Sequence, residues 1–138
     1  VAADTATFGV TPTKLGIAYK FEDSRLLVKN IGVKAAKEML FTAQLFPASD
    51  ALRWGLISRT VPEAELDFSV DKLAHDIAAN APLSLKATKL IINETQKISE
   101  NADLELCQKL LDACTNSEDV VEGRQAFLEK RPPKFKGI

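Results

Sequence analysis

The pattern of apolar and polar positions predicts a chain that starts with a short strand and is otherwise mostly helical. Residues 1–10 place β-branched Thr and Val around Phe8, which favours a strand ending near Val10. Thr11-Pro12 breaks this strand, because proline lacks the N–H that a ladder needs. Residues 56–61 alternate again and predict a second strand. Because one or two isolated strands are not stable, these strands need partners that the chain does not obviously supply.

Helical spacing predicts two helices within residues 23–42. Asp23 or Ser24 can cap the first helix, and Gly32 is a typical stop at its end. The second helix then runs over residues 33–42.

A brief helix follows, with Ser49 as its cap, Gly55 as its stop and Trp54 as a core or interface anchor. Four longer helices are predicted beyond it, of which one starts at Pro82 and the last is capped by Ser117. Their apolar stripes are Val70, Leu73, Ala74, Ile77 and Ala78; Leu83, Ala87, Leu90, Ile91 and Ile98; Leu106, Cys107, Leu110, Leu111 and Cys114; and Val120, Val121, Phe127 and Leu128, which we expect to face inward.

Composition narrows the classes of partner. The chain has 138 residues, 46% hydrophobic and 27% charged, with a net charge of -1. This balance is typical of a globular protein and gives no electrostatic reason to expect nucleic acid or a membrane surface as a partner. No run of about 18 apolar residues exists. The chain begins with Val1 and shows no signal peptide, so we interpret it as a fragment or a processed product.

Cysteine and histidine offer little for metal or acid-base chemistry. Cys107 and Cys114 lie seven residues apart on one predicted helix, about 10 Å along its axis, too far for a disulfide. His75 is the only histidine and lies opposite the apolar stripe of its helix, so we expect no metal site. Buried free thiols favour a reducing compartment, hence the cytoplasm.

Two regions remain as candidates for binding. The tail "KRPPKFKGI" carries four cations and no acid, and charge alone favours a solvated tail and a phosphate-binding patch about equally. The acids of the last helix, Glu118, Asp119, Glu122 and Glu129, are interpreted as first-turn and surface groups that suit the helix dipole. Near the other end, "ATFGVTPTKLGIAY" holds no carboxylate, histidine or cysteine, and Tyr19 is either a buried tyrosine with a satisfied hydroxyl or a donor in a pocket.

Four segments, in order, resemble the C-terminal half of the enoyl-CoA hydratase/isomerase, or crotonase, superfamily. They are "ADTATFGVTPTKLGI", "IGVKAAKEMLFTAQLFPASDALRWGLISRTVP", "LAHDIAANAPLSLKATKLIIN" and "SEDVVEGRQAFLEKRPPKFKG". The resemblance implies an α/β, ClpP/crotonase-like fold, of which residues 1–66 are the end of the ββα spiral core. Residues 67–138 would be the helical trimerisation region of a homo-trimer or hexamer.

The same resemblance implies acyl-CoA substrates and a thioester enolate held by two backbone N–H groups. Both donors and the first hydratase glutamate belong to the N-terminal half of the family fold, so we expect this chain alone to be inactive and to need that half as a partner. No cofactor is expected besides the CoA thioester that is the substrate. Phe127 and Lys130 match the family's "F-x-x-K", which faces the adenosine phosphate of CoA, often in a neighbouring subunit.

One family residue is missing. Hydratases and many isomerases of the family carry a catalytic glutamate in "FG-x-PE", where this chain reads Phe8, Gly9, Val10, Thr11 and Pro12. Pro12 therefore stands at the glutamate's position and can neither take nor give a proton. The family's glycine-rich "PG-x-GG" stretch is also replaced, by "YKFED".

The local sequence "TP-x-x-LG-x-x-Y" is similar to the methylmalonyl-CoA decarboxylase branch of the family. This similarity implies that Tyr19 is catalytic and that Thr11 and Pro12 line the acyl pocket. Decarboxylation needs no active-site carboxylate, and such a group would repel the substrate's own charge. The sequence thus favours a lyase. An atypical enoyl-CoA hydratase or isomerase, a non-catalytic CoA-binding or assembly subunit, and a basic-tailed interaction module are the alternatives.

Overall fold

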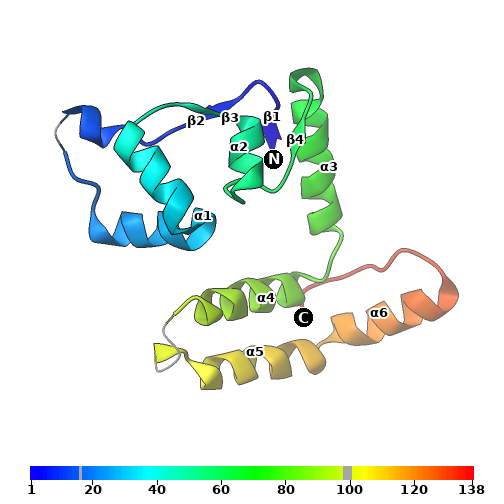
Figure 1. Ribbon diagram of the computed structural model, residues 1–138. Helices are drawn as coiled ribbons and strands as arrows, with labels where there is room; N and C mark the ends of the chain where they lie inside the picture. The colour runs from blue at the N-terminus through cyan, green and yellow to red at the C-terminus, as the bar shows by residue number, and fades with distance from the viewer. Residues whose placement is uncertain (16, 98–100) are drawn as a thin grey trace. The chain divides into compact units, whose positions relative to one another are not determined.

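The computed structural model describes residues 1–15, 17–97 and 101–138, and it forms two compact units (Figure 1). The first unit covers residues 1–72 and the second residues 73–138. The boundary falls within helix α3 (Leu66–Ala78). The expected division after residue 66, between the end of the spiral core and the trimerisation region of the family fold, is a different division from these two compact units. It stays a prediction.

Two small sheets organise the first unit. Strand β1 (Ala2–Ala3) pairs in parallel with β4 (Thr60–Val61), and β2 (Thr7–Phe8) pairs antiparallel with β3 (Phe46–Pro47). The prediction of a strand over residues 56–61 was therefore too long. Its first part is drawn away from the sheet, because the N–H groups of Leu56 and Ile57 both donate to the carbonyl of Ala51.

Helix α1 (Phe21–Thr42) confirms the prediction of two helices around a glycine. Gly32 has φ 77° and ψ 162°, which interrupts the helix. This backbone region is almost closed to residues with a side chain. The predicted caps were wrong, since the helix starts earlier, after Lys20, and without a side-chain cap. The Ser24 hydroxyl instead donates to the carbonyl of Tyr19 at 3.4 Å.

The core of the first unit is built mainly from α1 and β3. Ile31, Ala35, Ala36, Met39 and Phe46 are buried together. The ring of Trp54 packs edge-on against Phe46, with 4.8 Å between centroids, which confirms Trp54 as a core anchor. Trp54 directly follows helix α2 (Ala48–Arg53), which begins after Pro47 and takes no side-chain cap, so the cap predicted at Ser49 was wrong.

The second unit is helical. Helices α4 (Pro82–Thr95) and α5 (Leu104–Thr115) lie side by side, and α6 (Glu118–Glu129) follows them (Figure 1). Pro82 at the first position of α4 and Ser117 as the cap of α6 are both confirmed. The hydroxyl of Ser117 accepts the N–H of Val120 at 3.3 Å. The stripe residue Ile98 lies outside the described residues.

The apolar face predicted for α6 does not point inward. Val121, Phe127 and Leu128 are 68%, 83% and 76% exposed, whereas Ala126 and Asp119 are buried. The reason is that the chain after α6 folds back along the opposite face of the helix and covers it. Among the residues described, no helix is both long and apolar enough to cross a membrane.

A glycine fixes how the segment after β2 is placed. A Cβ atom at Gly9 would lie 2.7 Å from the carbonyl oxygen of Gln44 and 2.9 Å from a methyl group of Leu45. Only glycine lets the two backbones approach so closely. The 3₁₀ helix η1 (Pro12–Leu15) follows and contacts α1.

We predict that Gly9→Ala lowers the free energy of unfolding of the full-length protein by about 1–3 kcal/mol, because the backbone of Gln44 cannot yield to the added methyl group. The midpoint of urea unfolding measures this change. Gly123→Ala is the matched control, since its Cβ would meet only the ring of Phe135, at 3.4 Å, on a helix that favours alanine. Equal midpoints for the two variants would contradict the proposed close approach.

Candidate functional site

The predicted site residues fall into two groups, one in each unit. The first group, Thr11, Pro12 and Tyr19, lies between β2 and α1. The carbonyl of Thr11 accepts the N–H of Lys14 at 3.2 Å, and that of Pro12 accepts the N–H of Ile17 at 3.1 Å. These bonds make a compact turn, in which the half-buried Pro12 opens η1.

The turn is also tied to α1. The Thr13 hydroxyl donates to the carbonyl of Leu40 at 3.0 Å. Thr13 is thus occupied structurally, whereas Thr11 is exposed. The bond fixes one end of the segment that leads to Tyr19.

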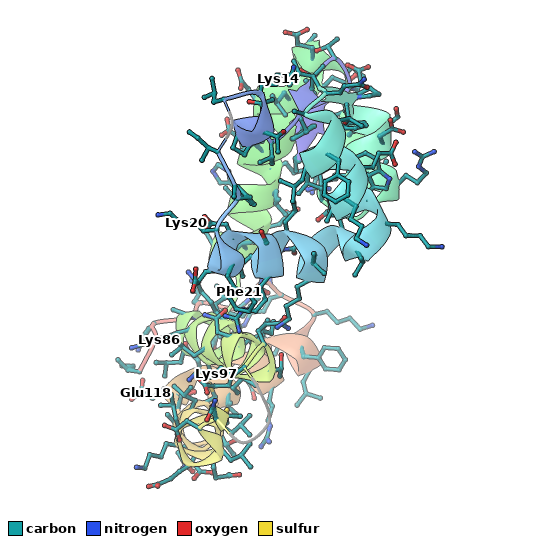
Figure 2. The ribbon with its side chains drawn as sticks, turned by 60° about the vertical axis from the view of Figure 1, so that its left-hand side comes forward. Lys14, Lys20, Phe21, Lys86, Lys97 and Glu118 are labelled. Atoms are coloured by element: carbon teal, nitrogen blue, oxygen red, sulfur yellow. The ribbon has the colours of Figure 1, made fainter. Side chains whose placement is uncertain are left out.

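Tyr19 is half-buried and directly precedes Lys20 in the sequence. Figure 2 shows Lys20 and Phe21 at the start of α1. Its hydroxyl makes no hydrogen bond to any residue that the structure describes. The expectation of a buried tyrosine with a satisfied hydroxyl is therefore not met in this chain. The apolar neighbours Leu15, Ile17 and Phe21 are all exposed. The segment thus presents an apolar surface with one hydroxyl donor available. Gly16 lies outside the described residues.

The second group, Phe127 and Lys130, lies at the end of α6, where the tail, residues 130–138, turns back along the helix. Asp119 is 3% exposed, and its two carboxylate oxygens accept the N–H groups of Lys136 and Gly137 at 2.7 and 2.9 Å. The N–H of Glu118, in the first turn of α6, donates to the carbonyl of Ile138 at 2.7 Å. The end of the tail and the start of the helix therefore satisfy each other's polar groups.

Glu122 holds the beginning of the tail, one turn along from Asp119. Its carboxylate takes two hydrogen bonds from the guanidinium of Arg131, at 2.6 and 3.0 Å, and one from the N–H of Lys134 at 2.7 Å. These donors lower the pKa of Glu122 to about 2, with the Arg131 bonds as the largest cause. Arg131 also pairs with Glu129 at 2.5 Å, and the two carboxylates raise its pKa.

A cavity of about 650 Å³ opens beside this contact. Glu118, at the start of α6 (Figure 2), is one of its lining residues. The lining residues are Glu118, Asp119, Val121, Glu122, Gln125, Arg131, Lys134 and Lys136. Most of its charged groups already pair with one another, so the cavity has little charge left for a ligand.

Phe127 and Lys130 lie at the far end of α6. The ring of Phe127 is almost fully exposed, and Lys130 follows the helix in the left-handed region, at φ 53° and ψ 40°. The Lys130 side chain has no ion pair with any described residue, unlike Arg131. Lys136 and Glu118 stand 3.7 Å apart and are mostly exposed, which makes their pairing weak.

The role of two acids was not predicted from the sequence. Asp119 and Glu122 were expected at the surface, but they bind the tail. The signal was present in their spacing of three residues, which puts both on one helix face, and in the basic tail that follows the helix. Among the described residues, no cluster of three or more His, Cys, Asp or Glu side chains could hold a metal ion.

A family model described as enoyl-CoA hydratase/isomerase matches residues 1–138. The chain belongs to this family. The prediction of crotonase-superfamily membership is confirmed.

Relatives of known name support the family and show its range. The chain is 35% identical to methylmalonyl-CoA decarboxylase of Escherichia coli, over 99% of this chain and 53% of that protein. It is 36% identical to carnitinyl-CoA dehydratase of Proteus mirabilis, over 99% of this chain and 54% of that protein. The chain thus spans about half the length of the curated relatives it matches.

A solved enoyl-CoA hydratase/isomerase family protein from Hyphomonas neptunium matches 96% of this chain and 50% of its own chain, with a TM-score of 0.84 and 38% identity. The predicted fold class is confirmed: the chain has a crotonase-like α/β fold and comprises the end of the spiral core and the mostly helical C-terminal region.

The low pKa of Glu122 leads to a prediction of pH dependence. Its folded-state pKa of about 2 lies below the ordinary value of 4.5, so its contribution to stability is full above pH 4.5 and is lost as the pH falls towards 2. We expect Glu122→Gln to lower the Tm of the full-length protein at neutral pH, and the Tm difference from wild type to vanish between pH 4.5 and 2.

Glu118→Gln is the matched control for this pH series, because Glu118 lies on the same helix in a weak, exposed pair. Its Tm should stay close to that of wild type throughout. A Tm difference for Glu122→Gln that is independent of pH would contradict the assignment.

Proposed function

We propose that the full-length protein is an acyl-CoA enzyme that stabilises a thioester enolate, and that it is a decarboxylase acting on a CoA thioester with a carboxylate on Cα. The observation that carries the choice of reaction is Pro12, a residue without a titratable group at the position of the family's hydratase glutamate. Residues 6–19 contain no carboxylate at all. This chain spans about half of its relatives, so the activity belongs to the full-length protein and this chain alone is proposed to be inactive.

The reaction follows from this arrangement. The bond between Cα and the substrate carboxylate breaks, CO₂ leaves, and the electron pair passes into the thioester to form the enolate. A proton from water or an acid then completes the product. No residue has to remove a proton from Cα, so the absence of a base at Pro12 is tolerated. A carboxylate there would face the substrate carboxylate and weaken its binding.

The geometry around Tyr19 supports the same reaction. Its hydroxyl is free of hydrogen bonds to the described residues, and the apolar side chains beside it are exposed. A hydroxyl donor in an apolar wall can orient the leaving carboxylate by one hydrogen bond, while the wall disfavours the charged carboxylate relative to CO₂. We assign Tyr19 this role, with Thr11 and Pro12 as neighbours in the acyl pocket. No cofactor is required.

A hydratase or dehydratase is the second candidate. Glu22 and Asp23 occupy the first turn of α1, three and four residues after Tyr19, and both are exposed. Either carboxylate could serve as a base from a position different from the family's usual one. The relative from Proteus mirabilis, named a dehydratase, is as similar as the decarboxylase, so identity does not decide between the two.

We further propose that the N-terminal half of the fold and further copies of the protein, as a trimer or hexamer, cover the large exposed side chains of this chain. Phe21, Phe41 and Phe68 are all more than 70% exposed. Burial of such rings is the main driving force for assembly. We also propose a cytoplasmic location, where the two cysteine thiols stay reduced.

The first test is the activity of the full-length protein on methylmalonyl-CoA and on crotonyl-CoA, followed by mass spectrometry of the products. We expect loss of CO₂ from methylmalonyl-CoA, and a decrease of about 10–100-fold in kcat/KM for Tyr19→Phe, which removes one hydrogen bond to a charged group. Rapid hydration of crotonyl-CoA that survives Tyr19→Phe but is lost in Glu22→Gln or Asp23→Asn would establish the second candidate instead.

The second test places a carboxylate at the position of Pro12. We expect Pro12→Glu to decarboxylate methylmalonyl-CoA at least about tenfold more slowly than Pro12→Gln, because the two side chains differ mainly in charge and the glutamate repels the substrate carboxylate. The comparison cancels the effect of losing the proline ring. Equal rates for the two variants would mean that residue 12 does not face the substrate carboxylate.

A further inference from the structure

The four cations of the tail are not equivalent in the structure. Arg131 forms hydrogen bonds and ion pairs with Glu122 and Glu129. Lys136 stands near Glu118 in a long, exposed pair. The side chains of Lys130 and Lys134 have no ion pair among the described residues. Of these two, Lys130 directly follows α6 and is the nearer in sequence to Phe127, so it is the cation that is left beside Phe127 for an external anion.

The backbone of Lys130 is unusual. It lies in the left-handed region directly after α6, a backbone conformation that glycine adopts most often at helix ends. A residue with a side chain stays in this region only where the surroundings hold it. Here the Lys130 N–H donates to the carbonyl of Phe127, and the N–H of Arg131 donates to that of Ala126.

The clamp that holds the turn from the other side is Glu122. It binds both the guanidinium of Arg131 and the N–H of Lys134, so it fixes the chain on the C-terminal side of Lys130. The arrangement also has an electrostatic effect. Arg131 bonds the carboxylates of Glu122 and Glu129, which would otherwise repel an anion approaching Lys130.

We propose that Glu122 and Arg131 are positioning residues for anion recognition by Lys130. The pair fixes the turn that displays the lysine ammonium beside the exposed ring of Phe127, and the charge of Arg131 offsets part of the negative charge of Glu122 and Glu129. The anion is a phosphate monoester on a nucleoside, for which Phe127 provides a stacking surface. This inference rests on the proposed function as an acyl-CoA enzyme and on the role that the family resemblance implies for Phe127 and Lys130, which is to hold the adenosine phosphate of CoA.

The test is calorimetry of the full-length protein with CoA and with dephospho-CoA, which lacks only the phosphate monoester. Wild type should bind CoA about tenfold more tightly than dephospho-CoA, and Lys130→Ala should abolish this ratio. Glu122→Gln should reduce the ratio to about twofold while leaving the affinity for dephospho-CoA unchanged. Glu118→Gln, the matched control on the same helix, should keep the wild-type ratio.

Arg131→Lys is the second variant, which keeps the charge but cannot make the paired hydrogen bonds. Its ratio of affinities for CoA and dephospho-CoA should fall between about twofold and the roughly tenfold of wild type. This variant still tests the proposal if Glu122→Gln does not fold. An unchanged ratio in both variants overturns the positioning role. So does an equal loss of affinity for both ligands, because a purely structural defect would weaken both.

The two proposals can fail separately. A wild-type protein that fails to distinguish CoA from dephospho-CoA overturns the present inference, whatever its activity. A wild-type protein that turns over no acyl-CoA, but shows the ratio and its loss in Glu122→Gln, overturns the proposed reaction and supports the positioning role.

Discussion

Close packing through small side chains is the constraint on which this structure depends. Most of the buried apolar residues among those described are alanines, and Met39 is the only large side chain that is completely buried. Gly9 extends the same principle, since the backbone of Gln44 occupies the space that a side chain would need. Small residues bring the elements together, whereas several large rings, such as those of Phe21, Phe41 and Phe68, point outward. The apolar core that the described residues form is therefore small.

The tail along α6 obeys a second constraint, the satisfaction of backbone polar groups. Residues 132–138 form no regular structure, so their N–H groups have no partners within a helix or sheet of their own. Asp119 and Glu122 supply the acceptors. Two carboxylates on successive turns of one helix thus do for the tail what a neighbouring strand does elsewhere. This arrangement explains why Asp119 is buried although it carries a charge.

The sequence predicted the local backbone structure better than it predicted the contacts between distant segments. Gly32, Pro82 and Ser117 acted as expected, because their effect on the backbone depends on neighbouring residues only. The predictions for Ser49 and residues 56–61 were wrong. The hydrogen bonds from Leu56 and Ile57 to the carbonyl of Ala51, which keep the start of residues 56–61 out of the sheet, cannot be seen in a pattern of apolar and polar residues. The fold class and the candidate residues came from resemblance to the family, not from periodicity. The clamp on the tail was missed because charge patterns along a chain do not show which acids a distant segment will approach.

The left-handed turn at Lys130 has one more consequence. For the backbone alone, glycine is the best residue there, because it has no Cβ to be crowded. For the proposed contact with a phosphate, a long cationic side chain supplies a charge that glycine lacks. Stability and the proposed ligand recognition thus favour different amino acids at this one position.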